Sequence, residues 1–598
     1  MNALQIPLKS LGSNESLLVI DVGEINTRAV LFDIVDANYR FIASSIAPTT
    51  VNPPLQHAGY GVRLAIEYLE TNTGRTFIGE DEKLIMPTQE DGRGVDAFAM
   101  ILSAGVPLNV VVMGVLEEFS VESARRLAES VYSRVSATFH MNDGLKAVER
   151  SQEIVRLLPD LILIAGGTEQ GAQQPVLQML KQAAMACSFL PKDVRPIVLY
   201  AGNSDLSQKA KEMFAPLTSV KTAPNIRPQA DTEKPEAART QIAQVFRQVR
   251  LNQMMGIQTL DTWSGKQLLP SATAFGRIIR FLSMDDPGRG VLGVDVGATN
   301  TTIAAAWCGE LTIGNYPKMR FDPEETASIS DDELKEIMTW VYARVSEDYV
   351  LNYIYNKQIY PASLPQTFKD EVIEQALARH ALRRALQKTM QNFRETHQQP
   401  GGQNEESKPF SFPPFEPIVA AGSVLTRAPS LAQSALMLLD GIQPTNVTTL
   451  ILDQNHLAAA MGAAALSNPT LTVQVIDSNA FLNLGMVISP VSSVRSGMPV
   501  LRLRMVSDGG MDIKAEVNQG EMRVFPLPAD QNATLILKPL NLADIGMGAG
   551  NGGRLNKVSG GALGVVIDAR GRPLRLPLEL SEKRDLYKGW LKALRESR

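Results

Sequence analysis

Cysteine and histidine are both scarce in this chain of 598 residues. Only Cys187 and Cys308 are present, far apart in the sequence. Two isolated thiols cannot build a disulfide framework or a thiolate metal site, so we expect a reducing compartment. The five histidines lack the spacing of metal ligands and are interpreted as ordinary surface or core residues. They are His57, His140, His380, His397 and His456.

An excess of one charge is also missing. The chain has 58 basic and 63 acidic residues, a formal net charge of −5, with no basic stripe and no long run of like charge. Binding to nucleic acid generally needs a concentrated basic surface, and so does attraction to an anionic membrane. We therefore expect neither nucleic acid nor a membrane surface as the main partner.

Long apolar runs are missing as well. Residues 99–116 are interrupted by Gly105, Pro107 and Asn109, which predicts two buried segments around a turn. Residues 457–476 are rich in small side chains and broken by Pro469, which predicts a buried helix followed by a strand. Neither stretch offers the roughly 20 strongly apolar residues of a membrane span. The first residues lack the apolar core of a signal peptide, so a cytoplasmic location is expected.

Two distant stretches of the chain share one plan. They are Leu17–Asp33, LLVIDVGEINTRAVLFD, and Val291–Ala306, VLGVDVGATNTTIAAA. In each, an apolar run breaks into Asp-x-Gly and continues through small hydroxyl or amide side chains into a second apolar run. This pattern predicts a β-strand that turns tightly into another strand, with Asp21 or Asp295 at the end of the first strand.

The glycines of these turns suit phosphate binding. Gly23 and Gly297 tolerate positive φ and leave backbone N–H groups free to hold phosphate oxygens. The acid beside each glycine would orient a hydrated Mg²⁺, an ion that takes few protein carboxylates. One Asp-x-Gly turn is ordinary turn chemistry. Two with the same flanks favour a nucleotide clamped between two related lobes.

Chain length predicts two to four domains. We expect an N-terminal extension, 1–15, followed by a first lobe, 16–288, that carries an inserted subdomain. The second lobe, 289–469, would contain a helical insert and a mobile, polar, Pro/Gly-rich loop near 398–417. Alternating segments separated by Asp-Gly-Gly and Asn-Gln-Gly predict a β-rich C-terminal domain at 470–598.

Three further apolar runs end in glycine turns. Those at 159–171 and 197–204 are typical of ligand sites at the carboxyl edge of a parallel sheet, and equally of turns that let a helix pack closely. Both interpretations stay open, with packing favoured. The third, IVAAGSVLTR at 418–427, precedes a helix and would offer an adenine ring an apolar slot with backbone polar groups at its edge.

The two hairpins and the third glycine turn together resemble the actin, Hsp70 and sugar-kinase superfamily. In that superfamily two ribonuclease-H-like α/β lobes surround a nucleotide cleft and hold Mg-ATP between two phosphate loops and an adenosine-binding turn. By this resemblance residues 21–28 match the first loop, 295–302 the second loop and 421–424 the adenosine turn.

More narrowly, the chain resembles the glutamate mutase accessory protein L family over most of residues 15–470. The supporting segments are the second loop, Asp96–Met113, Asp160–Gly171 and Tyr200–Ser204. The resemblance implies a chaperone-like ATPase that opens an adenosylcobalamin-dependent mutase so that damaged cofactor can leave. The sequence has no Asp-x-His-x-x-Gly cobalamin motif, so we expect it to act on a cobalamin enzyme and not to bind cobalamin.

The resemblance also implies roles for single residues. Asp21 and Asp295 would hold hydrated Mg²⁺ and orient the attacking water, as the catalytic and metal-binding acids. The other implied nucleotide contacts are Gly23, Asn26, Thr27 and Arg28, then Gly297, Thr299, Asn300 and Thr301, and finally Gly422, Ser423 and Val424. Alternatively, the Asn and Thr side chains satisfy only the hairpin backbone, and Arg28 is a solvated strand residue.

Two residues depart from the family pattern. Glu24 stands where the family usually has Ser or Thr, and a carboxylate about 4 Å from a phosphate oxygen would repel it by about 4 kcal/mol unless a cation or a rotated side chain offsets this. Thr302 stands where the family commonly has Asp, the acid expected to help position Mg²⁺ or water. The chain is therefore expected to be a weak ATPase at most.

Three functions remain open at this stage. The first is an ATP-binding, chaperone-like accessory protein of a cobalamin-dependent mutase. The second is a non-catalytic actin-like scaffold with an eroded nucleotide site, which Glu24 and Thr302 favour. The third is a small-molecule kinase of the sugar-kinase type, although no catalytic base can be nominated for it. Whether the chain forms a homo-oligomer also stays open.

Overall fold

The computed structural model describes residues 16–171, 173–317, 329–397, 413–465 and 467–595. These residues form two compact units. Unit 1 comprises the described parts of Met1–Gly105, Arg250–Ala274 and Ala459–Ala480, and unit 2 those of Val106–Val249, Phe275–Ala458 and Phe481–Arg598. The expected N-terminal extension and most of the expected mobile loop lie outside the described residues. Each compact unit is assembled from separated segments of the chain. The domain boundaries predicted from the sequence, which divide the chain into consecutive segments, therefore stay a prediction.

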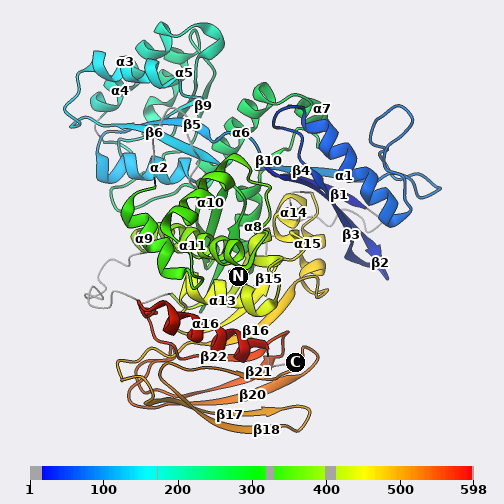
Figure 1. Cartoon of the computed structure of the whole chain (residues 1–598). Coiled ribbons are helices and arrows are strands. Elements are labelled where there is room, and N and C mark those ends of the chain that lie inside the picture. The colour runs from blue at the N-terminus through cyan, green and yellow to red at the C-terminus, as the bar shows by residue number, and fades with distance from the viewer. Residues whose placement is uncertain (1–15, 172, 318–328, 398–412, 466, 596–598) are drawn as a thin grey trace, which may run out of the picture. The chain divides into compact units, whose positions relative to one another are not determined.

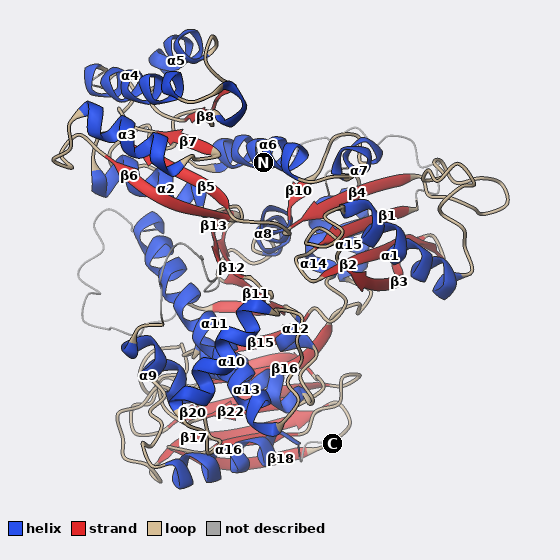
Figure 2. Cartoon of the chain, turned by 45° about the horizontal axis from the view of Figure 1, so that its top comes forward, coloured by secondary structure: helices blue, strands red, loops and turns tan. Residues whose placement is uncertain are grey.

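Unit 1 is built on a five-stranded sheet of order β10-β4-β1-β2-β3 (Figure 2). Its strands are β1 (Leu17–Val22), β2 (Asn26–Val35), β3 (Asn38–Pro48), β4 (Ala97–Leu102) and β10 (Leu269–Pro270). The first three strands are antiparallel, whereas β4 runs parallel to β1 and β10 runs parallel to β4. The helices α1 (Ala58–Thr73), α7 (Ile257–Trp263) and α15 (Pro469–Ile476) pack against β3, β4 and β3, respectively.

Unit 2 repeats this arrangement within a larger sheet. Its order is β13-β12-β11-β14-β15-β16-β22-β19. The strands are β11 (Gly290–Val296), β12 (Asn300–Trp307), β13 (Glu310–Pro317), β14 (Phe415–Ala421), β15 (Val447–Leu452), β16 (Leu482–Ile488), β19 (Met522–Phe525) and β22 (Gly564–Asp568). Three antiparallel strands are again followed by two parallel ones. Both units therefore have the ribonuclease-H-like strand order, and the expected α/β fold class is confirmed.

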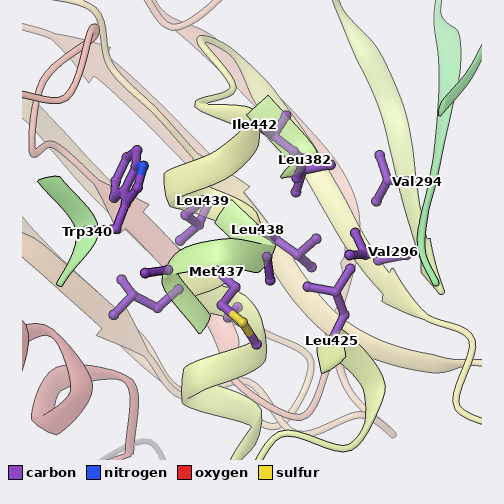
Figure 3. Packing of buried hydrophobic residues seen from close by; sticks show 14 of the residues in the cluster. Val294, Val296, Trp340, Leu382, Leu425, Met437, Leu438, Leu439 and Ile442 are labelled. Atoms are coloured by element: carbon purple, nitrogen blue, oxygen red, sulfur yellow. The ribbon is translucent and has the colours of Figure 1, made fainter. Parts of the chain in front are cut away.

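Helices cover this second sheet and create its core. They are α9 (Asp331–Trp340), α10 (Glu347–Ile359), α11 (Phe368–His397), α12 (Ser423–Thr426) and α13 (Leu431–Ile442). Every residue of α13 after Leu431 is buried, as expected for a helix that is apolar on all sides. Figure 3 shows Leu438 of α13 and Leu425 of α12 in one cluster with Val296 of β11. This packing fixes the helices beside the end of β11.

The inserted subdomain of unit 2 is a separate parallel sheet of order β6-β5-β7-β8-β9. Its strands are β5 (Leu108–Met113), β6 (Ser133–Phe139), β7 (Leu161–Ile164), β8 (Ile197–Tyr200) and β9 (Val220–Thr222). Its helices are α2 (Glu122–Ala128), α3 (Ala147–Leu157), α4 (Gln174–Phe189) and α5 (Ser207–Phe214), and α6 (Glu236–Gln253) follows them in the chain.

The glycine turns of this subdomain serve close packing. A Cβ on Gly166, whose φ is +125°, would lie 2.9 Å from a methyl of Val115. A Cβ on Gly202 would lie 2.5 Å from the carbonyl oxygen of Gly166. Glu169 then joins the turns, because its carboxylate accepts hydrogen bonds from Ser204 and from Asn225, the latter at 2.8 Å. The structure thus supports the packing interpretation of these two turns.

The C-terminal strands form two sheets that share a core. Strands β16, β22 and β19 extend the sheet that contains β11, while β17 (Pro499–Ser507), β18 (Asp512–Asn518), β20 (Asn532–Pro539) and β21 (Gly553–Ser559) make a separate antiparallel sheet (Figure 1). Leu503 and Met505 of β17 belong to the same buried cluster as Val565 and Ile567 of β22. The expected antiparallel β-region is therefore present, and it packs directly on the sheet of unit 2.

One expectation from the sequence is wrong. The residues after Pro469 form the helix α15 instead of a strand, following the helix α14 (Leu457–Ala464). The side chain of Asn468 accepts a hydrogen bond from the N–H of Leu471 at 3.1 Å and so caps the helix. Proline is well tolerated in the first helical turn, and Pro469 is the first residue of α15.

A buried cluster of charges holds the far end of α13. Asp440 accepts hydrogen bonds from Arg379 of α11 at 2.7 Å, from Arg570 at 2.8 Å and from Tyr587 of α16 (Leu580–Arg595) at 3.2 Å. Arg570 also binds Asp568, and all five of these side chains have almost no exposed surface. The cluster therefore ties α11, α13, the end of β22 and the C-terminal helix together.

Replacement of Asp440 by Asn should destabilise unit 2 strongly. The substitution leaves two buried guanidinium groups with less compensating charge, and breaking a buried ion pair in this way costs about 3–5 kcal/mol. Urea unfolding followed by tryptophan fluorescence would measure the change, since Trp590 lies beside Arg570. The matched control is Asp512→Asn in the exposed pair with Arg504, which should change the stability little because solvent screens exposed ion pairs. Equal effects of the two substitutions would contradict this account.

Candidate phosphate loops and adenosine turn

The two Asp-x-Gly hairpins have the same register in the structure. Asp21 is the penultimate residue of β1 and pairs with Arg28, the third residue of β2. Asp295 is the penultimate residue of β11 and pairs with Thr302, the third residue of β12. In each unit a parallel strand, β4 or β14, lies on the other side of the acid-bearing strand. The repeat seen in the sequence is therefore a repeat of local structure.

The first turn is closed by its own hydrogen bonds. The N–H of Gly23 donates to the carbonyl of Asn26 at 3.0 Å, and a Cβ on this glycine would lie 2.9 Å from the same oxygen. Thr27 is fully buried, and its hydroxyl lies 2.8 Å from the hydroxyl of Thr49, which in turn donates to the carbonyl of Gly23 at 2.7 Å. In this conformation Thr27 supports the turn, while Asn26 is exposed.

Glu24 has hydrogen-bond donors of its own within unit 1. Its carboxylate accepts from the N–H of Gly105 at 2.8 Å and from the side-chain amide of Asn52 at 3.1 Å. Only 9% of the residue is exposed. The sequence predicted that the Glu24 carboxylate would repel a phosphate unless its charge were offset. These two hydrogen bonds hold the carboxylate in place and offset part of that charge. Neither partner had a signal in the sequence, because both come from loops remote from the hairpin.

Asp21 keeps capacity to accept further hydrogen bonds. Its two contacts are long, 3.8 Å to Arg28 and 3.4 Å to the hydroxyl of Ser271. Burial raises the pKa of Asp21 above its ordinary value, while Arg28 and Ser271 oppose the shift. Since an ionised carboxylate offers about four lone-pair sites, metal-bound waters would be suitable donors. Arg28 is only 6% exposed, which excludes the solvated strand residue considered above.

The second turn contains a buried threonine hydroxyl, that of Thr301. Thr301 is 2% exposed, and its Oγ1 has no hydrogen-bond partner among the described residues. Thr299 is also buried, whereas Gly297 is half-buried in the turn itself. The side-chain amide of Asn300 donates to Asn315 at 3.1 Å. Thr301 pairs with Val296, whereas Thr302 pairs with Asp295, so the Thr301 hydroxyl lies on the opposite face of the sheet from the Asp295 carboxylate. The strand pairing therefore does not support the phosphate contact expected for Thr301.

The expected adenosine turn lies against this second loop. Ala421 at the end of β14 pairs with Asp295, and a Cβ on Gly422, whose φ is +97°, would lie 2.3 Å from the carbonyl oxygen of Val296. Only glycine fits such a backbone position. Ser423 is exposed and Val424 half-buried at the start of α12. The structure thus brings the second loop and the adenosine turn to one edge of one sheet in unit 2.

Asp453 is a further acid at this edge that the sequence analysis missed. It follows β15, its N–H donates to the carbonyl of Ala420 at 2.8 Å, and its carboxylate accepts from the N–H of Leu457 at 2.7 Å. The signal was present, because an apolar strand that ends in Asp is the same pattern that singled out Asp21 and Asp295. Its hydrogen bonds assign it to the start of α14.

The donor set fits Mg-ATP, with Mg²⁺ held largely through waters. Within the part of the chain that the structure describes, no group of three or more His, Cys, Asp or Glu side chains could hold a metal ion by itself. Mg²⁺ typically keeps several waters and takes one or two carboxylates together with phosphate oxygens. Each loop, taken by itself, offers one acid and bare glycine backbone, which matches that requirement.

Among the helices of the described residues, none has both the length and the apolar character of a membrane span.

Comparison with solved structures finds several distant similarities. The nucleotide-free structure of an acetone carboxylase is 12% identical, with a TM-score of 0.32, and the match covers 84% of this chain and 81% of that one. The ethanolamine utilization protein EutJ from Carboxydothermus hydrogenoformans is 9% identical, with a TM-score of 0.27 and coverage of 76% and 91%. A nucleotide-free diol dehydratase-reactivating factor is 10% identical, with a TM-score of 0.26 and coverage of 76% and 99%.

Sequence comparison is more specific. No curated protein matches the sequence. The family model described as MutL protein, however, matches residues 17–480, which include both hairpins, the inserted subdomain and the adenosine turn. The family resemblance inferred from the sequence is thereby confirmed, and the chain belongs to the MutL protein family, the family of glutamate mutase accessory proteins.

Proposed function

We propose that this protein is an ATP-binding, chaperone-like accessory protein that remodels an adenosylcobalamin-dependent mutase. Family membership supports the accessory role. One structural observation carries the nucleotide part. Asp295, Gly297 and Gly422 lie at one edge of one sheet in unit 2. An acid beside bare glycine backbone is a suitable place for phosphate oxygens and a hydrated Mg²⁺.

In this proposal each residue has a defined task. The N–H groups around Gly297, with the hydroxyl of Thr299, bind phosphate oxygens. Asp295 orients waters of the metal, and Asp21 does the same in the first loop. The glycine turn at Gly422, with the half-buried Val424 after it, would accept the adenine. ATP can drive a conformational change only if it binds one conformation of the protein more tightly than the other. That change would then be passed to the partner.

A non-catalytic scaffold is the second candidate. The acid common to the family is replaced by Thr302, and the hydroxyl of Thr302 accepts a hydrogen bond from Asn315 at 3.2 Å instead of facing free space. The position is therefore occupied by a neutral and satisfied group. Under this alternative the protein binds nucleotide for its structure, or not at all, and releases no phosphate.

Replacement of Asp295 by Asn should reduce the thermal stabilisation by Mg-ATP. A ligand at 100 times its dissociation constant adds about 2.7 kcal/mol to the stability of the state that binds it. Thermal-shift measurements with and without Mg-ATP would detect this in the wild type and a smaller shift in Asp295→Asn. We expect the same of Asp21→Asn. The control is Asp33→Asn, which affects an Asp–Arg pair at the other end of the first hairpin and should leave the shift unchanged. No shift in the wild type would remove the nucleotide proposal.

Replacement of Thr302 by Asp should increase phosphate release. The new carboxylate would pair across the strands with Asp295, and two acids so close raise the pKa of one of them, which suits a general base near neutral pH. General bases typically contribute a factor of 10² to 10⁴, so we expect at least about a tenfold increase in turnover of ATP. Thr302→Asn is the matched control without the charge. If the Asp and Asn variants hydrolyse ATP equally slowly, the missing acid does not limit hydrolysis.

The partner assignment can be tested with a cobalamin mutase directly. Glutamate mutase inactivated by bound hydroxocobalamin would be incubated with the protein, fresh adenosylcobalamin and Mg-ATP. We expect mutase activity to return only when both the protein and Mg-ATP are present, and to return more slowly with Asp295→Asn. Recovery that is independent of the protein, or absent while Mg-ATP binds normally, would refute the mutase part of the proposal and leave the nucleotide part standing.

A further inference from the structure

A row of polar side chains crosses three neighbouring strands of unit 2. Asp295 of β11 pairs with Thr302 of β12, and Thr302 pairs with Asn315 of β13. Directly paired residues lie on the same face of a sheet, so the three side chains form a line that starts at the second phosphate loop. Asn315 is 2% exposed. Asn315 is at the end of this line, so it contacts the second phosphate loop although it is not part of that loop.

The side chain of Asn315 makes two hydrogen bonds to the second loop. Its oxygen accepts from the amide of Asn300 at 3.1 Å, and its nitrogen donates to the hydroxyl of Thr302 at 3.2 Å. An amide side chain can both accept and donate, and here each function is used. Asn315 therefore fixes the side chains on both sides of Thr301, the residue whose buried hydroxyl lacks a partner among the described residues.

The backbone of Asn315 makes a third hydrogen bond, to the inserted subdomain. β13 is the edge strand of its sheet, so its outward N–H groups have no neighbouring strand. The N–H of Asn315 donates to the carbonyl oxygen of Glu129, at the end of α2, at 2.7 Å. The side chain of Glu129 is held in turn by Arg125 of α2 at 2.9 Å and by Lys388 of α11 at 2.6 Å. Glu129 is 8% exposed.

We propose that Asn315 is a positioning residue that couples the second phosphate loop to the inserted subdomain through Glu129. This inference rests on the proposed nucleotide site. Nucleotide that orders Asn300 and Thr302 also orders Asn315, and with it the hydrogen bond to Glu129. By thermodynamic reciprocity, a disturbance of Glu129 must change nucleotide affinity by the same factor. We call the hydrogen bonds from Asn300 and Thr302 through Asn315 to Glu129 the bridge. Through the bridge, nucleotide binding changes the stability of the subdomain next to Glu129.

The test is hydrogen exchange of the full chain with and without saturating Mg-ATP. In the wild type we expect Mg-ATP to slow exchange in the segment 125–139, which contains the end of α2 and β6, by about fivefold or more, the lower end of measured allosteric couplings. In Asn315→Ala the loop is released while the backbone N–H remains. Saturating Mg-ATP should then no longer slow exchange in this segment. In Glu129→Gln, isothermal titration should show Mg-ATP binding about fivefold weaker.

Asn483→Ala is the matched control. Asn483 of β16 also makes two side-chain hydrogen bonds in the same sheet, to Gly560 at 3.0 Å and to Gly485 at 2.9 Å, but it is outside the bridge. The nucleotide response of this variant should equal that of the wild type. The inference is overturned if Mg-ATP binds the wild type without protecting 125–139, or if protection persists in Asn315→Ala. A wild type that binds no Mg-ATP overturns the proposed function as well, so the two failures are distinguishable.

Discussion

The close approach of a glycine turn to the end of the neighbouring strand is the constraint on which the candidate site depends. The Cα of Gly422 lies so near the backbone of Val296 that any side chain would collide with it. This contact fixes the start of α12, and therefore of α13, against the end of the strand that carries Asp295. In the proposed site, the backbone that would bind phosphate and the turn that would bind adenine can adjoin only because no side chain separates them. Sequence places the two segments more than a hundred residues apart, and the sheet brings them together.

The hairpins were predictable from the sequence because every contact that defines them is local. The apolar runs, the acid and the glycine of each turn are contiguous, and the structure has them in identical register. The glycine turn at Gly422 was predictable for the same reason, while its contact with adenosine stays a prediction. The partners that complete these elements were not, since Ser271, Gly105 and Asn315 reach the loops through strand pairing and chain crossing that no local pattern encodes. The error at α15 also came from a local signal. Pro469 was interpreted only as a residue that ends a helix, whereas proline is equally common in the first turn of one.

The two departures from the family pattern have different physical consequences. Glu24 is embedded in donors from Gly105 and Asn52, so its charge is compensated and the first loop retains its shape. Thr302 instead removes a charge from the second loop, and Asn315 satisfies the neutral hydroxyl that replaces it. Under the proposed function, the first change adds no uncompensated charge to the loop, whereas the second removes an acid that hydrolysis would use. A site of the proposed kind, modified in this way, would bind nucleotide better than it hydrolyses it.

The C-terminal region stabilises the part of unit 2 that carries the candidate site. Helix α13 begins just after the adenosine turn and ends at Asp440, where Arg570 and Tyr587 from the C-terminal segments hold it. The helix is buried along almost its whole length, so its position is set from both ends and from the sheet beneath. A displacement at the Asp440 cluster would therefore be transmitted to the adenosine turn, because a packed helix shifts as a rigid body more readily than it deforms. Residues beyond the family match, which ends at residue 480, thus stabilise the helix that follows the glycine turn at Gly422.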